Sequence, residues 1–106
     1  MTLSEQEFRL KSDEALQQAR RGLMSLADAD AGFELELQNG VLNLVFEEPS
    51  ETKFVVSPNA PVRQIWVSAM GKSYKLAWSP DANAFVINGE TLTTLLDRLT
   101  RVFLQQ

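Results

Sequence analysis

The sequence predicts an α+β fold, a two-layer sandwich in which two helices pack on one face of a five- to six-stranded antiparallel sheet. Three observations predict it. The chain begins with a long segment of helical period, continues with short segments in which apolar and polar residues alternate, and ends with a second segment of helical period. Two helices with one apolar face each need a common surface to cover, and one face of a sheet provides it. We expect a single domain over residues 1–106.

The first helix is expected from about Ser4 to Leu26. Ser4 and Glu7 have the spacing of a capping box, which predicts the start of the helix. Gly22 lies beside the apolar stripe, where it permits close packing against a neighbour. The stripe repeats at steps of three and four and consists of Phe8, Ser12, Ala15, Leu16, Ala19, Leu23 and Leu26.

After a loop at 27–32 the period changes from 3.6 to 2. Residues 33–38 alternate between apolar and polar side chains, as in a strand with one wet face. Asn39-Gly40 follows, a dipeptide that favours a two-residue hairpin turn. Two prolines at 57–61 predict a loop there. Further strands are expected at 41–47, 52–57, 62–69, 74–78 and 85–87.

The second helix is expected from Leu92 to about Leu104, with Thr91 as its N-cap. Both helices then cover the same face of the sheet, and the other face is left to solvent or to a partner. In the strand at 62–69, alternation directs Gln64 and Trp66 away from the helices.

Composition excludes several classes of function. The chain has no histidine and no cysteine, which excludes disulfides, thiol nucleophiles, His-based triads and most zinc sites. A net charge of −4 disfavours binding to nucleic acid, and no apolar run approaches the ~18 residues of a membrane span. There is no glycine-rich phosphate loop and no Glu-x-x-His motif, so we expect no enzyme, and a ferroxidase is the least favoured of the functions considered. Any metal must be held by oxygen ligands.

The charge is unevenly distributed along the chain. Residues 1–27 are neutral overall, residues 28–51 hold seven acids and no base, and residues 52–106 have a net charge of +3. The candidate metal ligands are the acids of the first helix, the first loop and the first strand: Glu7, Asp13, Glu14, Asp28, Asp30, Glu34 and Glu36. Carboxylates of this kind suit iron, manganese, calcium or magnesium.

The simpler interpretation of these acids is a solvated face, since alternating Glu residues are the polar half of a strand pattern. An EF-hand is excluded, because Gly32 comes one position early and Asn39 stands where a bidentate Glu is required. A metal site here would therefore be open, made only of carboxylates, and weak.

A second candidate site lies on the strand at 62–69. Trp66 and Gln64 on an open sheet face, near Arg63, have the composition of a protein-binding hot spot. Lys72 and Lys75 nearby are suited to an acidic partner. The alternative is that Trp66 covers neighbouring strands or an arginine stem.

The order helix, strand meander, helix resembles the frataxin family, including the bacterial CyaY proteins. The resemblance covers residues 4–104 and is most specific in the strand at 61–66, Pro-Val-Arg-Gln-Ile-Trp. Gly40-Val-Leu-Asn-Leu44, Tyr74 and Asn88-Gly-Glu-Thr-Leu92 also match. It implies an iron-binding regulator of iron–sulfur cluster assembly, in which Fe²⁺ or Fe³⁺ binds weakly to an acidic ridge.

The same resemblance implies docking on the cysteine desulfurase and contact with the scaffold protein, as a monomer with iron-dependent oligomers. It assigns the ridge to the seven acids named above, with Asp28, Asp30, Glu34 and Glu36 the better aligned. It assigns the partner-facing surface to Arg63, Gln64 and Trp66. The alternative function is an adaptor of the same machinery in which iron binding is incidental.

Two departures from the family pattern affect the proposed surfaces. Arg20 and Arg21 stand where relatives have acids, so the ridge holds fewer acidic residues. Val62 replaces the asparagine that is common in the family before the Gln-Ile-Trp segment. A helix that begins almost directly after Met1 fits a bacterial cytoplasmic protein, or a mature mitochondrial matrix chain as the alternative.

Overall fold

Two helices and seven strands make up the fold, and the computed structural model describes residues 3–28 and 32–105. Helix α1 (Glu5–Leu26) precedes the sheet and helix α2 (Leu92–Leu104) follows it. The strands pair antiparallel in chain order. They are β1 (Phe33–Gln38), β2 (Val41–Phe46), β3 (Thr52–Asn59), β4 (Gln64–Ala69), β5 (Lys72–Ser79), β6 (Ala84–Ile87) and β7 (Glu90–Thr91).

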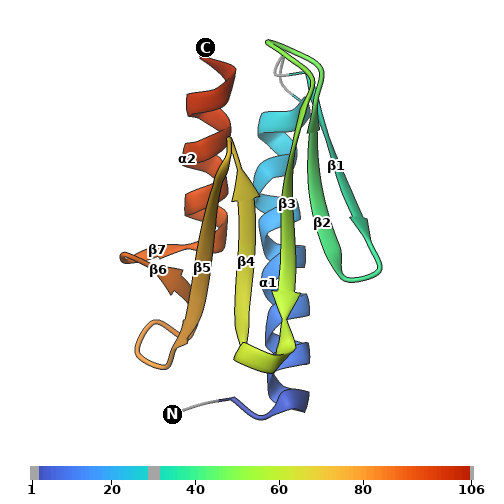
Figure 1. Cartoon of the computed structure of the whole chain (residues 1–106). Helices are drawn as coiled ribbons and strands as arrows, with labels where there is room; N and C mark the ends of the chain where they lie inside the picture. Colours follow the sequence, from blue (N-terminus) through green and yellow to red (C-terminus); the bar gives the residue numbers. More distant parts are fainter. Residues whose placement is uncertain (1–2, 29–31, 106) are drawn as a thin grey trace.

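Both helices lie on one face of the sheet (Figure 1), so the predicted α+β sandwich is confirmed. The core fills the space between the two layers. Phe46 of β2 is central, with its ring centroid 4.8 Å from that of Phe54 and 4.7 Å from that of Phe103 on α2. On β4, Ile65 and Val67 are buried beneath the helices. The other face of the sheet, here called the open face, is not covered by any element of residues 3–28 and 32–105.

Helix α1 begins as its sequence predicts. The Ser4 hydroxyl accepts from the Glu7 backbone N–H at 3.1 Å, and the Glu7 carboxylate accepts from the Ser4 N–H at 3.0 Å. Five residues of the predicted stripe are buried, and Ala15 and Leu26 are half-buried; the buried ones are Phe8, Ser12, Leu16, Ala19 and Leu23. The prediction for Gly22 is also confirmed, because a Cβ there would lie 2.7 Å from Cγ2 of Thr93. The two helices can approach this closely only because position 22 has no side chain.

Two-residue turns set the register of the sheet. Asn39 and Gly40 have φ of 53° and 76°, the left-handed pair that matches the twist of a hairpin. Asn88-Gly89 has the same geometry. It turns β6 into β7, a strand of only two residues that the sequence analysis missed. The expected five to six strands thus become seven.

The predicted loop at 57–61 is wrong in part, because β3 continues through Pro58 to Asn59. Beyond Val56, β3 pairs only with β4 and not with β2. A proline lacks a backbone N–H, and a segment paired on one side only tolerates that loss. The chain then forms a short 3-10 helix, Ala60–Val62, so β4 begins at Gln64 and not at Val62.

Candidate functional site

Trp66 lies on the open face of the sheet, as predicted. Along β4 the side chains alternate, so that Ile65 is fully buried while Trp66 keeps 36% of its surface exposed. Trp66 is one of five large hydrophobic residues exposed in the described part of the chain, and the one that lies on the sheet. An aromatic ring of this size on a sheet face is typical of a surface that binds another protein.

Two neighbours fix the Trp66 ring in place. Its Nε1 donates to Oε1 of Gln64 at 2.9 Å, and Nζ of Lys75 lies 4.9 Å from the ring centroid. Lys75 is opposite Trp66 across the β4–β5 ladder. Beside the ring, small side chains of Ser57 and Ser68 help to line a hollow of about 350 Å³. The site therefore consists of the oriented ring of Trp66, the ammonium group of Lys75 and the hollow beside the ring.

Arg63, the third predicted partner-binding residue, is placed differently. It is not on β4 but at the end of the 3-10 helix, with a left-handed φ of 55°. Its Nε donates to the carbonyl of Leu3 at 3.2 Å, and its guanidinium also donates to the carbonyl of Ala60. The side chain thus ties the segment before α1 to the β3–β4 connection, which is a structural role.

The acids of β1 lie on the same open face, at one edge of the sheet. Glu34 and Glu36 are exposed, and they pair with Val45 and Asn43 of β2. Glu34 also shares a hollow of about 320 Å³ with Glu47, which the sequence analysis did not select. Glu47 could have been found from the Asn39-Gly40 turn, because the two-residue loop places Val45 opposite Glu34 and Glu47 diagonal to it.

Asp28 is exposed at the end of α1, and Asp30 lies outside the described residues. Figure 1 shows the end of α1, the start of β1 and the β2–β3 connection at the same end of the molecule. These segments carry five acidic residues: Asp28, Glu34, Glu47, Glu48 and Glu51. Within residues 3–28 and 32–105, however, no three carboxylates converge as a metal-binding group.

The carboxylate of Glu7 is occupied by the cap of α1. The pKa of Glu7 is held below its ordinary value of 4.5. The main cause is the hydrogen bond that its carboxylate accepts from the Ser4 backbone N–H, and the Ser4 side chain adds to the effect. Asp13 accepts from Nε2 of Gln17 at 2.9 Å. These two acids are engaged within the first helix.

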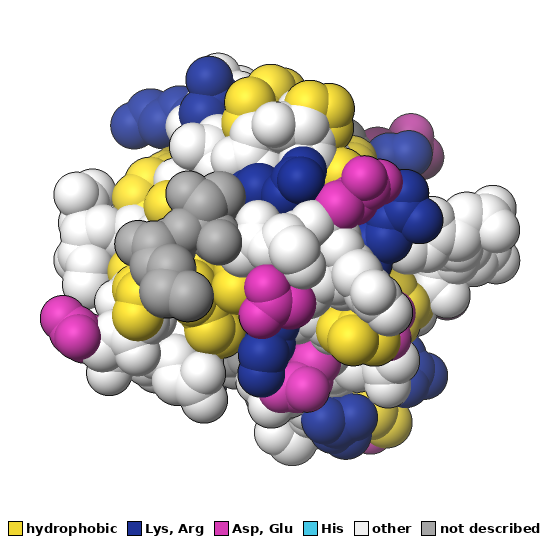
Figure 2. Space-filling model, turned by 90° about the horizontal axis from the view of Figure 1, so that it is seen from below, with side chains coloured by type: hydrophobic (Ala, Val, Ile, Leu, Met, Phe, Trp, Pro, Cys, Tyr) yellow, Lys and Arg dark blue, Asp and Glu magenta, His cyan; other side chains and the backbone are white. Residues whose placement is uncertain are grey.

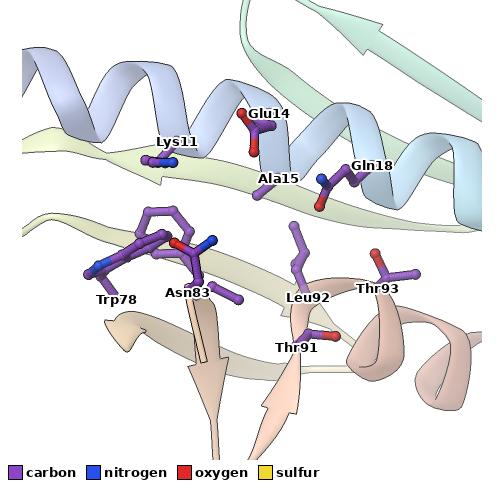
Figure 3. Close-up of a pocket in the computed structure, with 11 residues that line it drawn as sticks. Lys11, Glu14, Ala15, Gln18, Trp78, Asn83, Thr91, Leu92 and Thr93 are labelled. Carbon is purple, nitrogen blue, oxygen red and sulfur yellow. The ribbon is translucent and has the colours of Figure 1, made fainter. Parts of the chain in front are cut away.

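Glu14 faces a different part of the molecule from β1. It lines a cavity of about 140 Å³ between α1, the β5–β6 hairpin and the start of α2. Figure 3 shows Glu14, Lys11 and Gln18 on the helix above Trp78 and Asn83. Strands β6 and β7 form the edge of the sheet opposite β1. Glu14 also lines the hollow on the outer side of α1 with Leu10 and Gln17, and neither of these two hollows is lined by Glu34 or Glu36, so they do not join Glu14 to the acids of β1.

The end of the molecule that carries the start of α1 has mixed charge. Figure 2 shows Lys and Arg side chains beside Asp and Glu side chains on this end. One such pair is Arg9 with Glu5, at 2.6 Å. Three of the unbalanced acids, Glu47, Glu48 and Glu51, lie in the connection between β2 and β3.

Comparison with known proteins decides the family. The model of the frataxin-like domain matches residues 1–106, the whole chain. The chain belongs to the frataxin-like family. A solved frataxin of Psychromonas ingrahamii has the same fold, with a TM-score of 0.74 at 20% identity over 98% of this chain and 92% of that one.

Curated frataxin-like relatives carry the name iron-sulfur cluster assembly protein CyaY. The protein of Cupriavidus metallidurans is 38% identical over 63% of this chain and 60% of its own length. That of Paraburkholderia phymatum is 35% identical over 68% and 64%, and that of Pseudomonas aeruginosa 33% identical over 69% and 68%. The aligned part thus spans about 60% of the length of the relative from Cupriavidus metallidurans. Neither described helix of this frataxin-like chain combines the length and apolarity needed to cross a membrane.

Proposed function

We propose that this protein takes part in iron–sulfur cluster assembly as a regulator that docks on other components and catalyses no reaction of its own. The observation that carries the proposal is Trp66, exposed on the open face and held by Gln64 and Lys75. The names of the curated relatives support the process. We also propose the bacterial cytoplasm as its location, in keeping with the bacterial sources of those relatives.

The proposed partners are the cysteine desulfurase and the scaffold protein on which the cluster is built. The ring of Trp66 offers apolar area whose orientation is fixed before binding, so little side-chain entropy is lost on docking. Lys75 lies against that ring and favours a partner with an acidic group beside an apolar one. The hollow beside the ring can accept one such apolar side chain.

The test compares two exposed hydrophobic residues. Trp66→Ala should weaken binding of the purified desulfurase–scaffold complex by roughly thirtyfold, the loss expected for a hot spot. Val102→Ala is the control, because Val102 is 46% exposed on α2, away from the open face. Isothermal titration calorimetry in iron-free buffer measures both. Equal affinity of the two variants and the wild type would refute docking through Trp66.

We further propose that iron is a loosely held cargo at the acidic end of the molecule, on Asp28, Glu34 and Glu36, with Asp30 adjacent in sequence. Exposed carboxylates are hard oxygen ligands that suit iron. Since no three of them converge within the described residues, the donor set fits an open, exchangeable site and not a closed centre. Glu7, Asp13 and Glu14 remain candidate ligands by family resemblance, with weaker geometric support.

An anaerobic titration with Fe²⁺ tests this proposal by NMR. Paramagnetic broadening of amide signals should begin around residues 28–36 and should decrease in Glu34→Gln/Glu36→Gln. Asp81→Asn, in the β5–β6 connection, is the control and should leave the broadening unchanged. Broadening spread evenly over the surface would exclude a localised iron site.

The second candidate function is an adaptor whose acids contact a protein and whose iron binding is incidental. The two hollows that Glu14 lines contain neither Glu34 nor Glu36, which favours it. In that case Glu34→Lys/Glu36→Lys should weaken desulfurase binding in iron-free buffer. Weakening only when iron is present would favour the iron-dependent regulator.

A further inference from the structure

The outward face of α1 carries exposed residues that neither the core nor the proposed docking surface uses. Leu10 is 67% exposed, more than any other large hydrophobic residue in the described chain, and Met24 is 41% exposed. They are fourteen residues apart, so they lie on nearly the same line along the helix, about 21 Å from each other. A hollow of about 480 Å³ runs beside Leu10 and Gln17 on this face.

The charges on this face are arranged symmetrically about Gln17. Two acids lie three and four residues before it, Asp13 and Glu14, and two bases lie three and four residues after it, Arg20 and Arg21. The hydrophobic residues lie seven before and seven after. Along the helix, the order on this face is therefore apolar, acidic, Gln17, basic, apolar. When a second copy of the helix runs in the opposite direction, acidic residues face basic residues and apolar residues face apolar residues.

We propose that α1 pairs with α1 of a second copy of this chain, antiparallel, about a two-fold axis at Gln17. At 100° per residue, Glu14 and Arg21 lie on one flank of the Leu10–Gln17–Met24 line. Asp13 and Arg20 lie on the other flank.

The two-fold axis keeps each flank against the same flank of the second copy. Glu14 then faces Arg21 of the second copy, and Asp13 faces Arg20 of the second copy, each within one residue of the same height. Leu10 meets Met24 of the second copy at both ends. The interface is isologous, as the two-fold symmetry of a homodimer requires.

Charge complementarity selects this occupant and this direction. A parallel pair would place acids against acids and bases against bases, which is unfavourable. Arg20 and Arg21 form no ion pair with any residue in the described ranges, so both are free to pair between copies. One pair of helices buries a small area, which predicts a weak dimer that is sensitive to salt. Because α1 lies on the opposite side of the sheet from the open face, docking through Trp66 is not obstructed.

Sedimentation velocity of the full chain tests self-association, at low ionic strength, with a chelator to exclude metal-driven oligomers. The wild type should shift from one chain to two as concentration rises to about 1 mM, and should return to one chain at high salt. A wild type that stays monomeric throughout this range would overturn the proposal.

Two charge-reversed variants provide the decisive control. Arg20→Glu/Arg21→Glu makes the face wholly acidic, and Asp13→Arg/Glu14→Arg makes it wholly basic. Each alone should associate at least about tenfold more weakly than the wild type, because like charges then face each other. Mixed together, they should form a heterodimer with all four contacts attractive. Unchanged self-association of either variant, or no heterodimer in the mixture, would count against the pairing.

The direction of pairing is tested by disulfide formation, since the chain has no cysteine of its own. Gln17→Cys lies at the proposed axis and should cross-link to its counterpart under mild oxidation. Met24→Cys should not, because the two positions are about 21 Å apart in an antiparallel pair. Cross-linking of Met24→Cys to its counterpart would indicate a parallel pair and refute the proposal.

Discussion

The two faces of the sheet use neighbouring residues for different purposes. Ile65 and Trp66 are adjacent on β4, yet Ile65 is fully buried under the helices and Trp66 is 36% exposed on the open face. The two tryptophans show the same contrast. A lysine lies over each ring, Lys11 over Trp78 and Lys75 over Trp66, but the Trp78 ring is half-buried on the helix side, 5.2 Å from that of Phe85, whereas the Trp66 ring donates to Gln64 on the open face. The covered face determines stability, and the open face is available for recognition.

Truncating the covered face should have the largest effect. Ile65→Ala removes a fully buried side chain and leaves a cavity, so it should lower the free energy of unfolding by about 2–5 kcal/mol. Urea denaturation followed by circular dichroism measures the loss. A loss below about 1 kcal/mol would mean that the helices do not pack on β4 as described.

Truncating the open face should leave stability nearly intact. Trp66→Ala should change the free energy of unfolding by less than about 1 kcal/mol, since the ring lies outside the core and its interactions with Gln64 and Lys75 are on the open face. Trp78→Ala should cost about 2 kcal/mol, because it removes the contact with Phe85 beside the core. If both substitutions lower the free energy of unfolding equally, the two faces of the sheet do not differ in their contribution to stability.

The closeness of the helix layer can be tested at Gly22. In an exposed helix, alanine is favoured over glycine by about 1 kcal/mol. Here the new Cβ meets Cγ2 of Thr93, so Gly22→Ala should instead lower stability by roughly 1 kcal/mol. In a Thr93→Ser background, which removes Cγ2, the same substitution should become neutral or stabilising. Thermal unfolding of the four variants of this cycle gives the coupling.

The smallest effect is expected from the ion pair that joins β7 to α2. Arg98 donates to both carboxylate oxygens of Glu90, at 2.9 and 2.8 Å, and this bonding lowers the pKa of Glu90 from its ordinary 4.5. Ionised Glu90 therefore contributes stability at pH above 4.5, and the contribution is lost as pH falls through the lowered pKa.

Glu90→Gln should make the acid-induced loss of stability less steep in that window. Asp81→Asn is the control, since Asp81 forms no ion pair within residues 3–28 and 32–105. Denaturation midpoints measured from neutral to acid pH give the comparison. A Glu90→Gln profile that coincides with the wild type would show that the pair contributes nothing.

Much of the fold follows from local signals in the sequence. The box at Ser4 and Glu7, the Asn39-Gly40 turn and the Thr91 cap are each confirmed, because each depends on a few adjacent residues. Strand β7 was missed because two residues are too few to show a period. The path of β3 through Pro58 depends on where β2 stops pairing, which is a property of the sheet and not of the segment.

The candidate site was predictable in part. Alternation alone placed Trp66 and Gln64 on the open face, and this is confirmed. It could not place Lys75 against Trp66, since that contact depends on the two-residue turn at Met70-Gly71. Nor could spacing along α1 show that Glu14 faces β6 and α2 rather than β1, because the choice depends on how the helix is rotated against the whole sheet.

The contact between Gly22 and Thr93 has a consequence for how the chain folds during synthesis. The two residues are separated by the entire sheet in sequence, whereas each β-hairpin closes over a few residues. The hairpins can form as they leave the ribosome, but α1 acquires α2 as its neighbour only when residues 92–104 have been made. Until then the apolar stripe of α1 lacks part of its cover, so the nascent chain is open to chaperones and proteases while the whole sheet is being synthesised.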